Sequence, residues 1–126
     1  MNRNLPNQRA AFAFKRVSEL HGELLQKYRS LVRSFPAMIL SNGYGLAIAF
    51  LYSKKKGKES QIQSEHGQLY KHINDWLTEQ KFLSEDKKDL MKNIAESDKD
   101  TYRLLESETL ALLEWLKRFA EGAEAI

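Results

Sequence analysis

The sequence has no cysteine, only two prolines and six glycines, and no apolar run long enough to cross a bilayer. The absence of cysteine excludes a disulfide framework and a thiolate zinc site, and a reducing cytoplasm is the simplest location for such a chain. So few prolines and glycines argue against long loops. The chain turns almost wholly apolar over residues 44–52, far short of the roughly 20 residues of a membrane-spanning helix. We therefore expect a cytoplasmic protein without a membrane partner.

The 126 residues are 42% hydrophobic and 29% charged, which is typical of one globular domain. Apolar residues recur every three or four positions over most of the chain, and no long stretch alternates with the period of two that a strand requires. We predict an all-α fold, a compact single-domain bundle of five to six helices without a sheet. This domain is expected to span residues 1–126, with residues 1–5 disordered.

The first half of the chain contains a long apolar stripe with helical spacing. Asn4 and Pro6 suit the opening of a helix, and the stripe predicts one helix from Pro6 to Arg33. The residues of the stripe are Ala10, Ala13, Val17, Leu20, Leu24, Tyr28, Leu31 and Phe35.

Residues 34–45 are predicted to form a structural hinge. Pro36 lacks a backbone N–H and fits best in the first turn of a helix, so we expect one helix to end before it and another to begin there. Asn42 and Gly43 readily accept the left-handed conformation that closes a helix. The following stretch, residues 44–52, has no polar face, which predicts a helix buried on most sides.

The second half of the chain predicts three further amphipathic segments. The first contains Gly67, which lowers helix stability by about 1 kcal/mol relative to alanine. Ser84 is the expected N-cap of the next helix. Ser97 and Asp100 have the spacing of a capping box at the start of the last helix, which Gly122 is expected to end. The apolar residues of the last helix are Tyr102, Leu105, Leu112, Leu116 and Phe119.

The net charge of +3 is unevenly divided, because residues 1–58 carry +9 and residues 59–126 carry −6. Such an uneven distribution can attract a polyanion to one half and a basic partner to the other. The lysine-rich turn after residue 53 can reach phosphate groups. No exposed aromatics are predicted between the basic residues, and the tyrosines Tyr28, Tyr44 and Tyr52 are assigned to the core. The candidate RNA-binding residues are Arg9, Lys15, Arg16, Arg29, Arg33, Lys54, Lys55, Lys56 and Lys58.

Signals for catalysis are weak. The three histidines lack the spacing of paired zinc ligands, and neither a nucleophile elbow nor a phosphate-binding loop is present. His72, Asp75 and Glu79 can share one helical face, which leaves open a small metal-assisted nuclease. The simpler interpretation is an exposed polar edge. We therefore predict no enzyme activity, no metal site, no cofactor and no small-molecule substrate.

A family resemblance is carried by the segment RSFPAMILSNGYGLAIAFLYSKKKG, which follows an amphipathic helix that opens QRAAFAF. A proline-led turn, the break Ser41, Asn42, Gly43, and an apolar helix ending in Phe50 and Leu51 resemble the small subunit of the type III-B CRISPR-Cas effector, the Cmr complex. The similarity covers residues 8–57. Beyond it, only the helical character and the length are similar.

The resemblance implies a non-catalytic subunit of an RNA-guided ribonucleoprotein for antiviral defence. Its expected partners are further copies of itself, the large polymerase-like subunit, the RAMP backbone subunits, and guide and target RNA. In this interpretation the basic half faces RNA through sequence-independent backbone contacts, and the acidic half meets protein. The alternative is a helical protein-protein interaction adaptor without RNA contact, in which Trp76 or Trp115 anchors a partner.

Overall fold

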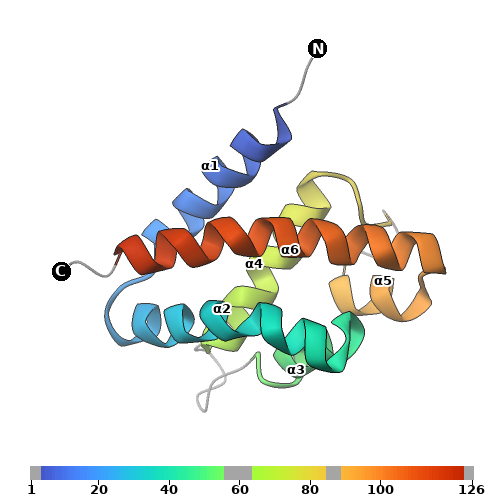
Figure 1. Cartoon of the computed structure of the whole chain (residues 1–126), viewed down its shortest axis with the longest axis horizontal. Helices are drawn as coiled ribbons and strands as arrows, with labels where there is room; N and C mark the ends of the chain where they lie inside the picture. Colours follow the sequence, from blue (N-terminus) through green and yellow to red (C-terminus); the bar gives the residue numbers. More distant parts are fainter. Residues whose placement is uncertain (1–3, 56–63, 85–88, 124–126) are drawn as a thin grey trace.

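The computed structural model describes residues 4–55, 64–84 and 89–123, and within these ranges the chain forms six α-helices and no strand. The predicted all-α fold is thus confirmed. The helices, labelled in Figure 1, are α1 (Leu5–Ser18), α2 (Gly22–Asn42), α3 (Tyr44–Ser53), α4 (Glu65–Glu79), α5 (Leu90–Glu96) and α6 (Lys99–Gly122).

Helix α6 is the longest and runs across the molecule, with α1, α2 and α4 packed against it. Its buried residues recur three or four positions apart, which places them on one face of the helix. Leu105, Leu112 and Leu116 on this face have no exposed surface. The shorter helices α3 and α5 contact each other and close one end of the bundle (Figure 1). The last helix therefore organises the core.

The predicted single helix from Pro6 to Arg33 is wrong, because the chain breaks between α1 and α2. Gly22 has a φ of +59°, a conformation that residues with a side chain rarely adopt. Leu20 stays buried within the break, so the apolar stripe continues across it and hides it in the sequence. Asn4 caps α1 as expected, since its side chain accepts the Asn7 N–H. Leu5 belongs to α1, whereas residues 1–3 of the segment expected to be disordered lie outside the described residues.

The helix end predicted before Pro36 is also wrong, because α2 continues through this proline to Asn42. A proline inside a helix costs about 3 kcal/mol. Its neighbours Phe35 and Ile39 are almost fully buried, and their burial holds the helix together through the missing hydrogen bond. The break at Gly43 is confirmed, since its φ of +92° ends α2 and its N–H donates to the Ile39 carbonyl. The role of residues 34–45 as a hinge stays a prediction.

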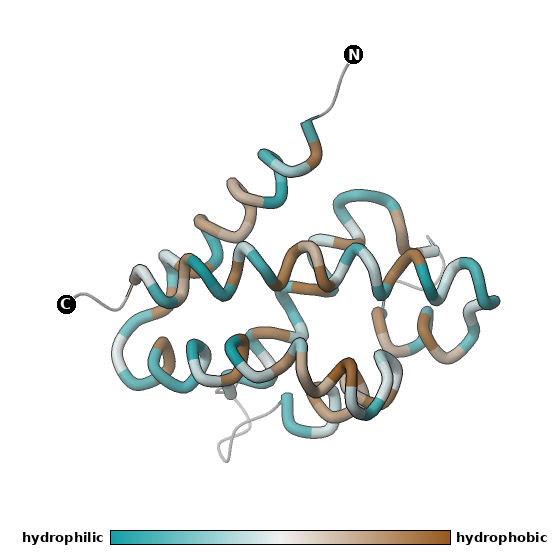
Figure 2. Tube along the Cα trace, viewed as in Figure 1, coloured by the Kyte–Doolittle hydropathy of each residue, from teal (hydrophilic) through white to brown (hydrophobic). Residues whose placement is uncertain are grey.

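We call residues 34–53 the α2–α3 corner; none of them is charged. In Figure 2 hydrophobic colour concentrates on α3 and the end of α2. The expectation that residues 44–52 are buried on most sides holds for the inner face of α3 only. Leu46 is 69% exposed and Tyr52 is 41% exposed, and Leu40 at the end of α2 is 81% exposed. The corner therefore presents apolar side chains to solvent.

Gly67 has a packing role that its helix propensity does not reveal. A Cβ atom at this position would overlap the carbonyl oxygen of Lys55, just after α3. Ser64 fastens the same junction, because its hydroxyl donates to the Lys54 carbonyl and accepts the Gly67 N–H. Glycine is therefore required here for the close approach of α3 to α4.

Two predicted helix starts are displaced. The Ser84 N–H donates to the side chain of Asn93, and α5 begins later, at Leu90. At α6 the cap is Asp98, whose carboxylate accepts the Thr101 N–H at 2.8 Å. The predicted box from Ser97 to Asp100 is therefore wrong by one residue, and helix propensity alone does not fix such boundaries.

Candidate nucleic-acid interface

Arg9 is held in a polar network between three helices. Its guanidinium donates to both carboxylate oxygens of Glu108 on α6, at 2.6 and 2.8 Å, and Trp76 on α4 donates its indole N–H to the same carboxylate. The Glu108 hydrogen bond raises the pKa of Arg9 above its usual value. Burial alone would raise the pKa of Glu108, but the hydrogen bonds from Arg9 and Trp76 lower it overall. The charge of Arg9 is thus matched inside the fold.

Arg16 is also paired across helices. Its guanidinium donates to Asp75 on α4 at 2.7 Å, and a second nitrogen lies 3.9 Å from Glu79. The same guanidinium packs 4.6 Å above the ring of Phe12. Lys71 shares the Asp75 carboxylate at 3.2 Å. Both α1 arginines among the candidate RNA-binding residues, Arg9 and Arg16, are therefore paired with carboxylates of other helices.

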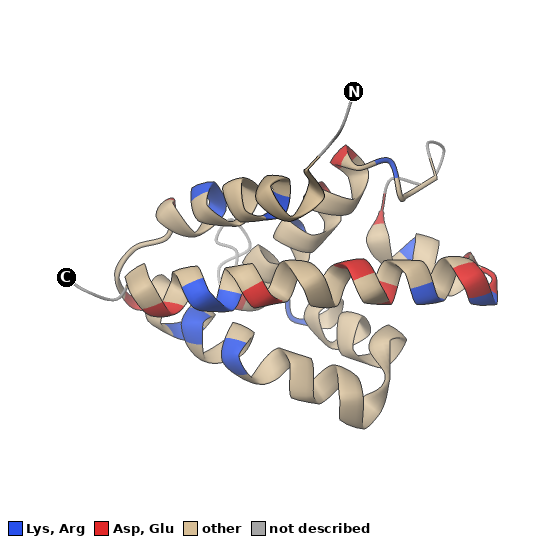
Figure 3. Cartoon of the chain, turned by 45° about the horizontal axis from the view of Figure 1, so that its top comes forward, with Lys and Arg blue, Asp and Glu red and all other residues tan. Residues whose placement is uncertain are grey.

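The basic residues of α2 have different surroundings. Arg33 lies 3.3 Å from Glu121 at the end of α6, and both side chains are partly exposed. Lys27 pairs with Glu23 one turn earlier. Arg29 is half-buried. Because carboxylates from the acidic half approach the basic half, the two halves partly neutralise each other, and blue and red segments intermingle on α6 and its neighbours (Figure 3).

The lysines that follow α3 lie beside aromatic rings. The Lys55 ammonium is 4.1 Å from the centre of the Tyr52 ring and 5.8 Å from that of Tyr70. Lys54 lies 5.6 Å from the Phe50 ring. We call this group, Phe50, Tyr52, Lys54, Lys55 and Tyr70, the lysine–tyrosine cluster. Together these residues can contact phosphate and offer a ring edge to a base.

The cluster corrects one assignment of the sequence analysis. Tyr28 and Tyr44 are core residues as predicted, with no more than 1% of their surfaces exposed, but Tyr52 is 41% exposed. An exposed aromatic next to lysines was missed because Tyr52 ends an apolar run. The position of Tyr52 just before the lysine-rich turn could have indicated that its ring is exposed. Lys56 and Lys58 lie outside the described residues.

Lys15 is an exposed cation on α1, one residue before Arg16. Among the candidate RNA-binding residues that the structure describes, Lys15 on α1 and Lys54 after α3 are therefore exposed cations, and Lys55 is half-buried beside the tyrosine rings.

The residues considered for a nuclease do not form an open site. His72 is 2% exposed and shares a 2.7 Å hydrogen bond with the Tyr28 hydroxyl. Burial, reinforced by the nearby charge of Arg16, lowers the pKa of His72 to about 3, while burial raises that of Tyr28. Asp75 faces Arg16 instead. Among the described residues no group of histidines and carboxylates is arranged to hold a metal ion.

The proposed tryptophan anchors are unavailable or only partly available. Trp76 is 1% exposed and bonded to Glu108, so its predicted role as an exposed anchor is wrong. Trp115 is half-buried and stacks on Phe119. None of the helices that the structure describes combines the length and apolar character of a membrane span.

Comparison with known protein families adds an observation that is independent of this geometry. A family model described as CRISPR-associated protein (Cas_Cmr5) matches residues 5–123. The match begins at the first residue of α1 and continues just past the end of α6. It therefore covers all six described helices.

Proposed function

Because the chain belongs to the Cas_Cmr5 family of CRISPR-associated proteins, we propose that it stacks with copies of itself in the type III-B Cmr complex and contacts guide and target RNA. Members of this family are structural small subunits, and their partners are other Cmr subunits. The single observation that carries the proposal is the match over residues 5–123. It confirms the resemblance noted in residues 8–57 and extends it to the second half.

The RNA contact in this proposal is electrostatic and independent of sequence. Lys15, Lys54 and Lys55 approach the phosphates, joined by Lys56 and Lys58 from outside the described residues. Arg9 and Arg16 contribute less, because each already donates to a carboxylate within the fold. Contacts with phosphates release counterions, so affinity falls with salt, with a log-log slope of roughly −0.7 per neutralised charge on a single strand.

The orientation first inferred from the charge asymmetry changes accordingly. In the folded chain the basic α1 lies against the acidic α6. The proposed RNA side is therefore the lysine–tyrosine cluster at the end of α3, and the proposed protein side includes the part of the α2–α3 corner around Leu40 and Leu46. The RNA side and the protein side are assigned from side chains that are exposed in the fold, and not from the net charge of each half of the sequence.

The test is purification of the tagged chain from its native host at low salt, followed by sequencing of bound small RNA and identification of bound proteins. We expect CRISPR-derived guide RNA and RAMP-type subunits. Recovery of the Cmr subunits with RNA bound equally well by the double variant Lys54→Glu, Lys55→Glu would refute the proposed RNA side. Lys27→Glu is the matched control, because Lys27 is exposed and pairs with Glu23 of the same helix. Recovery of partner proteins without any RNA would favour the adaptor interpretation.

A further inference from the structure

Two apolar surfaces of the described chain are left open to solvent. The first is the α2–α3 corner, where Leu40 and Leu46 are 81% and 69% exposed. These two leucines lie in a segment without charge, so burying them against a partner would add the stabilisation that their exposure forgoes. Figure 3 shows this corner without any charged segment.

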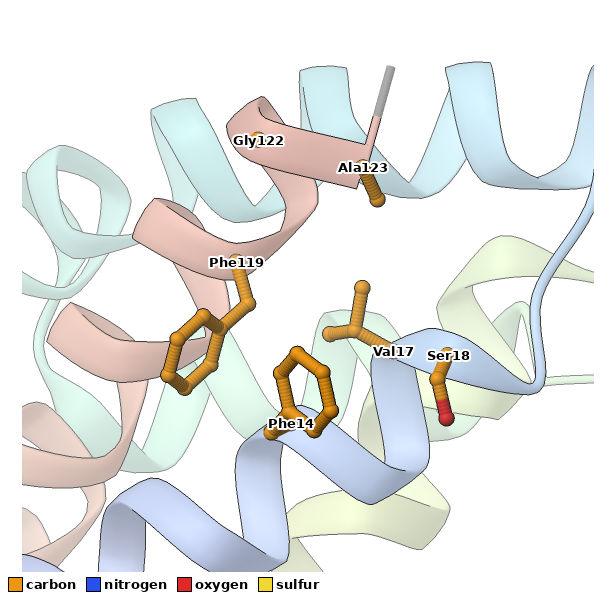
Figure 4. Close-up of a pocket in the computed structure, with 6 residues that line it drawn as sticks. All are labelled: Phe14, Val17, Ser18, Phe119, Gly122 and Ala123. Atoms are coloured by element: carbon orange, nitrogen blue, oxygen red, sulfur yellow. The ribbon is translucent and has the colours of Figure 1, made fainter. Parts of the chain in front are cut away.

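The second surface is a groove between α1 and the end of α6. Phe14 and Val17 from α1 face Phe119 and Ala123, and the cavity has a volume of about 400 Å³ (Figure 4). Phe14 meets Phe119 edge to face at 5.4 Å, yet 62% of its surface is exposed. A cavity of about 150 Å³ already accommodates a benzene-sized group, so this groove has room for two leucine side chains. We call it the Phe14 groove.

The absence of charged residues in the lining of the Phe14 groove limits which side chains can bind there. Its lining residues are all uncharged, so a charged side chain entering it would lose its hydration without gaining a partner. The matching occupant presents apolar side chains from a surface that is itself free of charge. The α2–α3 corner has this character, and it extends over twenty residues without a Lys, Arg, Asp, Glu or His.

The two surfaces lie too far apart to meet within one chain. The Phe14 groove lies at the end of α1, next to the start of α2, whereas Leu40 lies near the end of α2 (Figure 1). Leu40 lies eighteen positions after Gly22 along α2, which corresponds to about 27 Å at 1.5 Å per residue. Contact between two different patches of identical chains is heterologous, and it generates an open stack when the rotation does not close.

We propose that Leu40 and Leu46 of one copy insert into the Phe14 groove of the next copy. This inference rests on the proposed function, in which copies stack, and it specifies the two surfaces that meet. Each copy has one groove and one corner, so all copies in a stack point the same way, and only the end copies keep one of the two surfaces open. The last copy at each end offers one of the two surfaces to a different subunit.

The first experiment is complementation between two variants, measured by sedimentation of the full-length purified chain without RNA or other subunits. The corner variant, Leu40→Glu with Leu46→Glu, and the groove variant, Phe14→Glu, should each be monomeric where the wild type associates. Their equimolar mixture should form a one-to-one pair and nothing larger, since only one intact corner and one intact groove can meet. A mixture that stays monomeric overturns the proposal.

Leu104→Glu is the matched control, because Leu104 is 47% exposed on α6 and belongs to neither surface. This variant should associate as the wild type does. Circular dichroism of every variant establishes that the helices are retained, so that loss of association is not loss of folding.

The absence of cysteine provides a second measurement for weak association. Chains with Leu40→Cys and chains with Ala123→Cys, mixed and mildly oxidised, should form a disulfide between the two kinds of chain. The double variant should give a ladder of covalent oligomers. Cross-links only between two Leu40→Cys chains indicate a symmetric dimer and overturn the proposal, as does the absence of any cross-link.

These outcomes are separate from those of the proposed function. If the pairing fails while the tagged chain still recovers Cmr subunits and guide RNA, the stacking surfaces are wrong and membership of the complex stands. If the pairing succeeds but RNA and subunits are not recovered, the contact is real and the proposed function fails.

Discussion

The side formed by α1, α4 and α6 differs in its chemistry from the α2–α3 corner. The first is joined by charged side chains that reach across helices, as in Arg9 with Glu108 and Arg16 with Asp75. The second has no charge at all. It is held by apolar contacts, with Ile48 and Leu51 fully buried, and by neutral hydrogen bonds of Tyr44 and Gly45 to side chains of α6.

The charged side determines how the helices of one chain fit together, whereas the uncharged corner has exposed side chains that another molecule can contact. A buried carboxylate accepts only correctly placed donors, so Glu108 defines how α1, α4 and α6 fit together. No ion pair imposes such a requirement at the uncharged corner, where Leu40 and Leu46 remain exposed to solvent. The charged side therefore fixes the internal arrangement, while the uncharged side is suited to association.

The largest expected effect is removal of the charge that matches Glu108. Arg9→Met leaves a buried carboxylate without its main donor and should lower the free energy of unfolding by about 3 kcal/mol. Urea denaturation measures this loss. Arg33→Met is the matched control, since the partly exposed pair with Glu121 should contribute less than about 1 kcal/mol. Equal losses in the two variants would remove the distinction between buried and exposed pairs.

The junction between the two regions is tested by Gly67→Ala. In an open helix this change would stabilise, but here the new methyl group overlaps the Lys55 backbone. We expect a loss of about 2–3 kcal/mol in the free energy of unfolding, as for an overpacked core. Gly122→Ala is the control, because nothing lies within 4 Å of its Cβ position, and it should be neutral or slightly stabilising. A stabilised Gly67→Ala protein would contradict the close approach of α3 and α4.

Acid should weaken the charged side and not the corner, which contains no carboxylate or imidazole. The pKa of His72 is about 3 in the fold, below its usual 6.5. The unfolded chain thus binds the proton first, and stability is lost as pH falls from 6.5 towards 3. Between pH 7 and pH 5 we expect a loss of about 2 kcal/mol in the free energy of unfolding.

Urea denaturation at these two pH values measures the effect. The loss should shrink in His72→Gln, in which the buried imidazole is absent, even if that variant is less stable at both pH values. Exposed His21→Gln should retain it. An unchanged pH dependence in His72→Gln would assign the acid sensitivity to other groups.

The smallest effect on stability is expected at the exposed corner. Leu40→Gln should change the free energy of unfolding by less than about 0.5 kcal/mol, since the side chain contacts mainly solvent. The same substitution should weaken self-association measured by sedimentation. Leu51→Gln, at a fully buried position of the same corner, should destabilise strongly. A large stability loss in Leu40→Gln would show that Leu40 packs within its own chain.

Periodicity predicted the fold class because burial imposes it. Leu105, Leu112 and Leu116 recur at helical spacing and line the core. The break at Gly43 was also predictable, since its positive φ favours glycine. The break at Gly22 requires the same conformation, but the apolar stripe continues across it and outweighed a single glycine as a signal. At Pro36 the rule that proline interrupts a helix failed, because burial of the neighbouring side chains preserves α2.

The candidate site was less predictable, because its residues are distant in sequence. Arg9 and Glu108 are 99 positions apart, and no local sequence pattern predicts that they form an ion pair. The charge of each half therefore made Arg9 and Arg16 candidate RNA-binding residues, whereas the fold pairs both with carboxylates. Tyr52 shows the reverse case, where an apolar neighbourhood in sequence concealed exposure in the structure.

The packing of α1 on α6 also affects the order in which the chain can fold during synthesis. Residues 5–18 leave the ribosome well before the residues that cover them, since Glu108, Leu112 and Leu116 are translated some hundred positions later. Local helix formation is fast, but contacts over such separations form late. The nascent first helix thus exposes its apolar face until α6 has emerged. Completion of the fold is therefore a late translational event, and until then α1 is an apolar helix that a chaperone can bind.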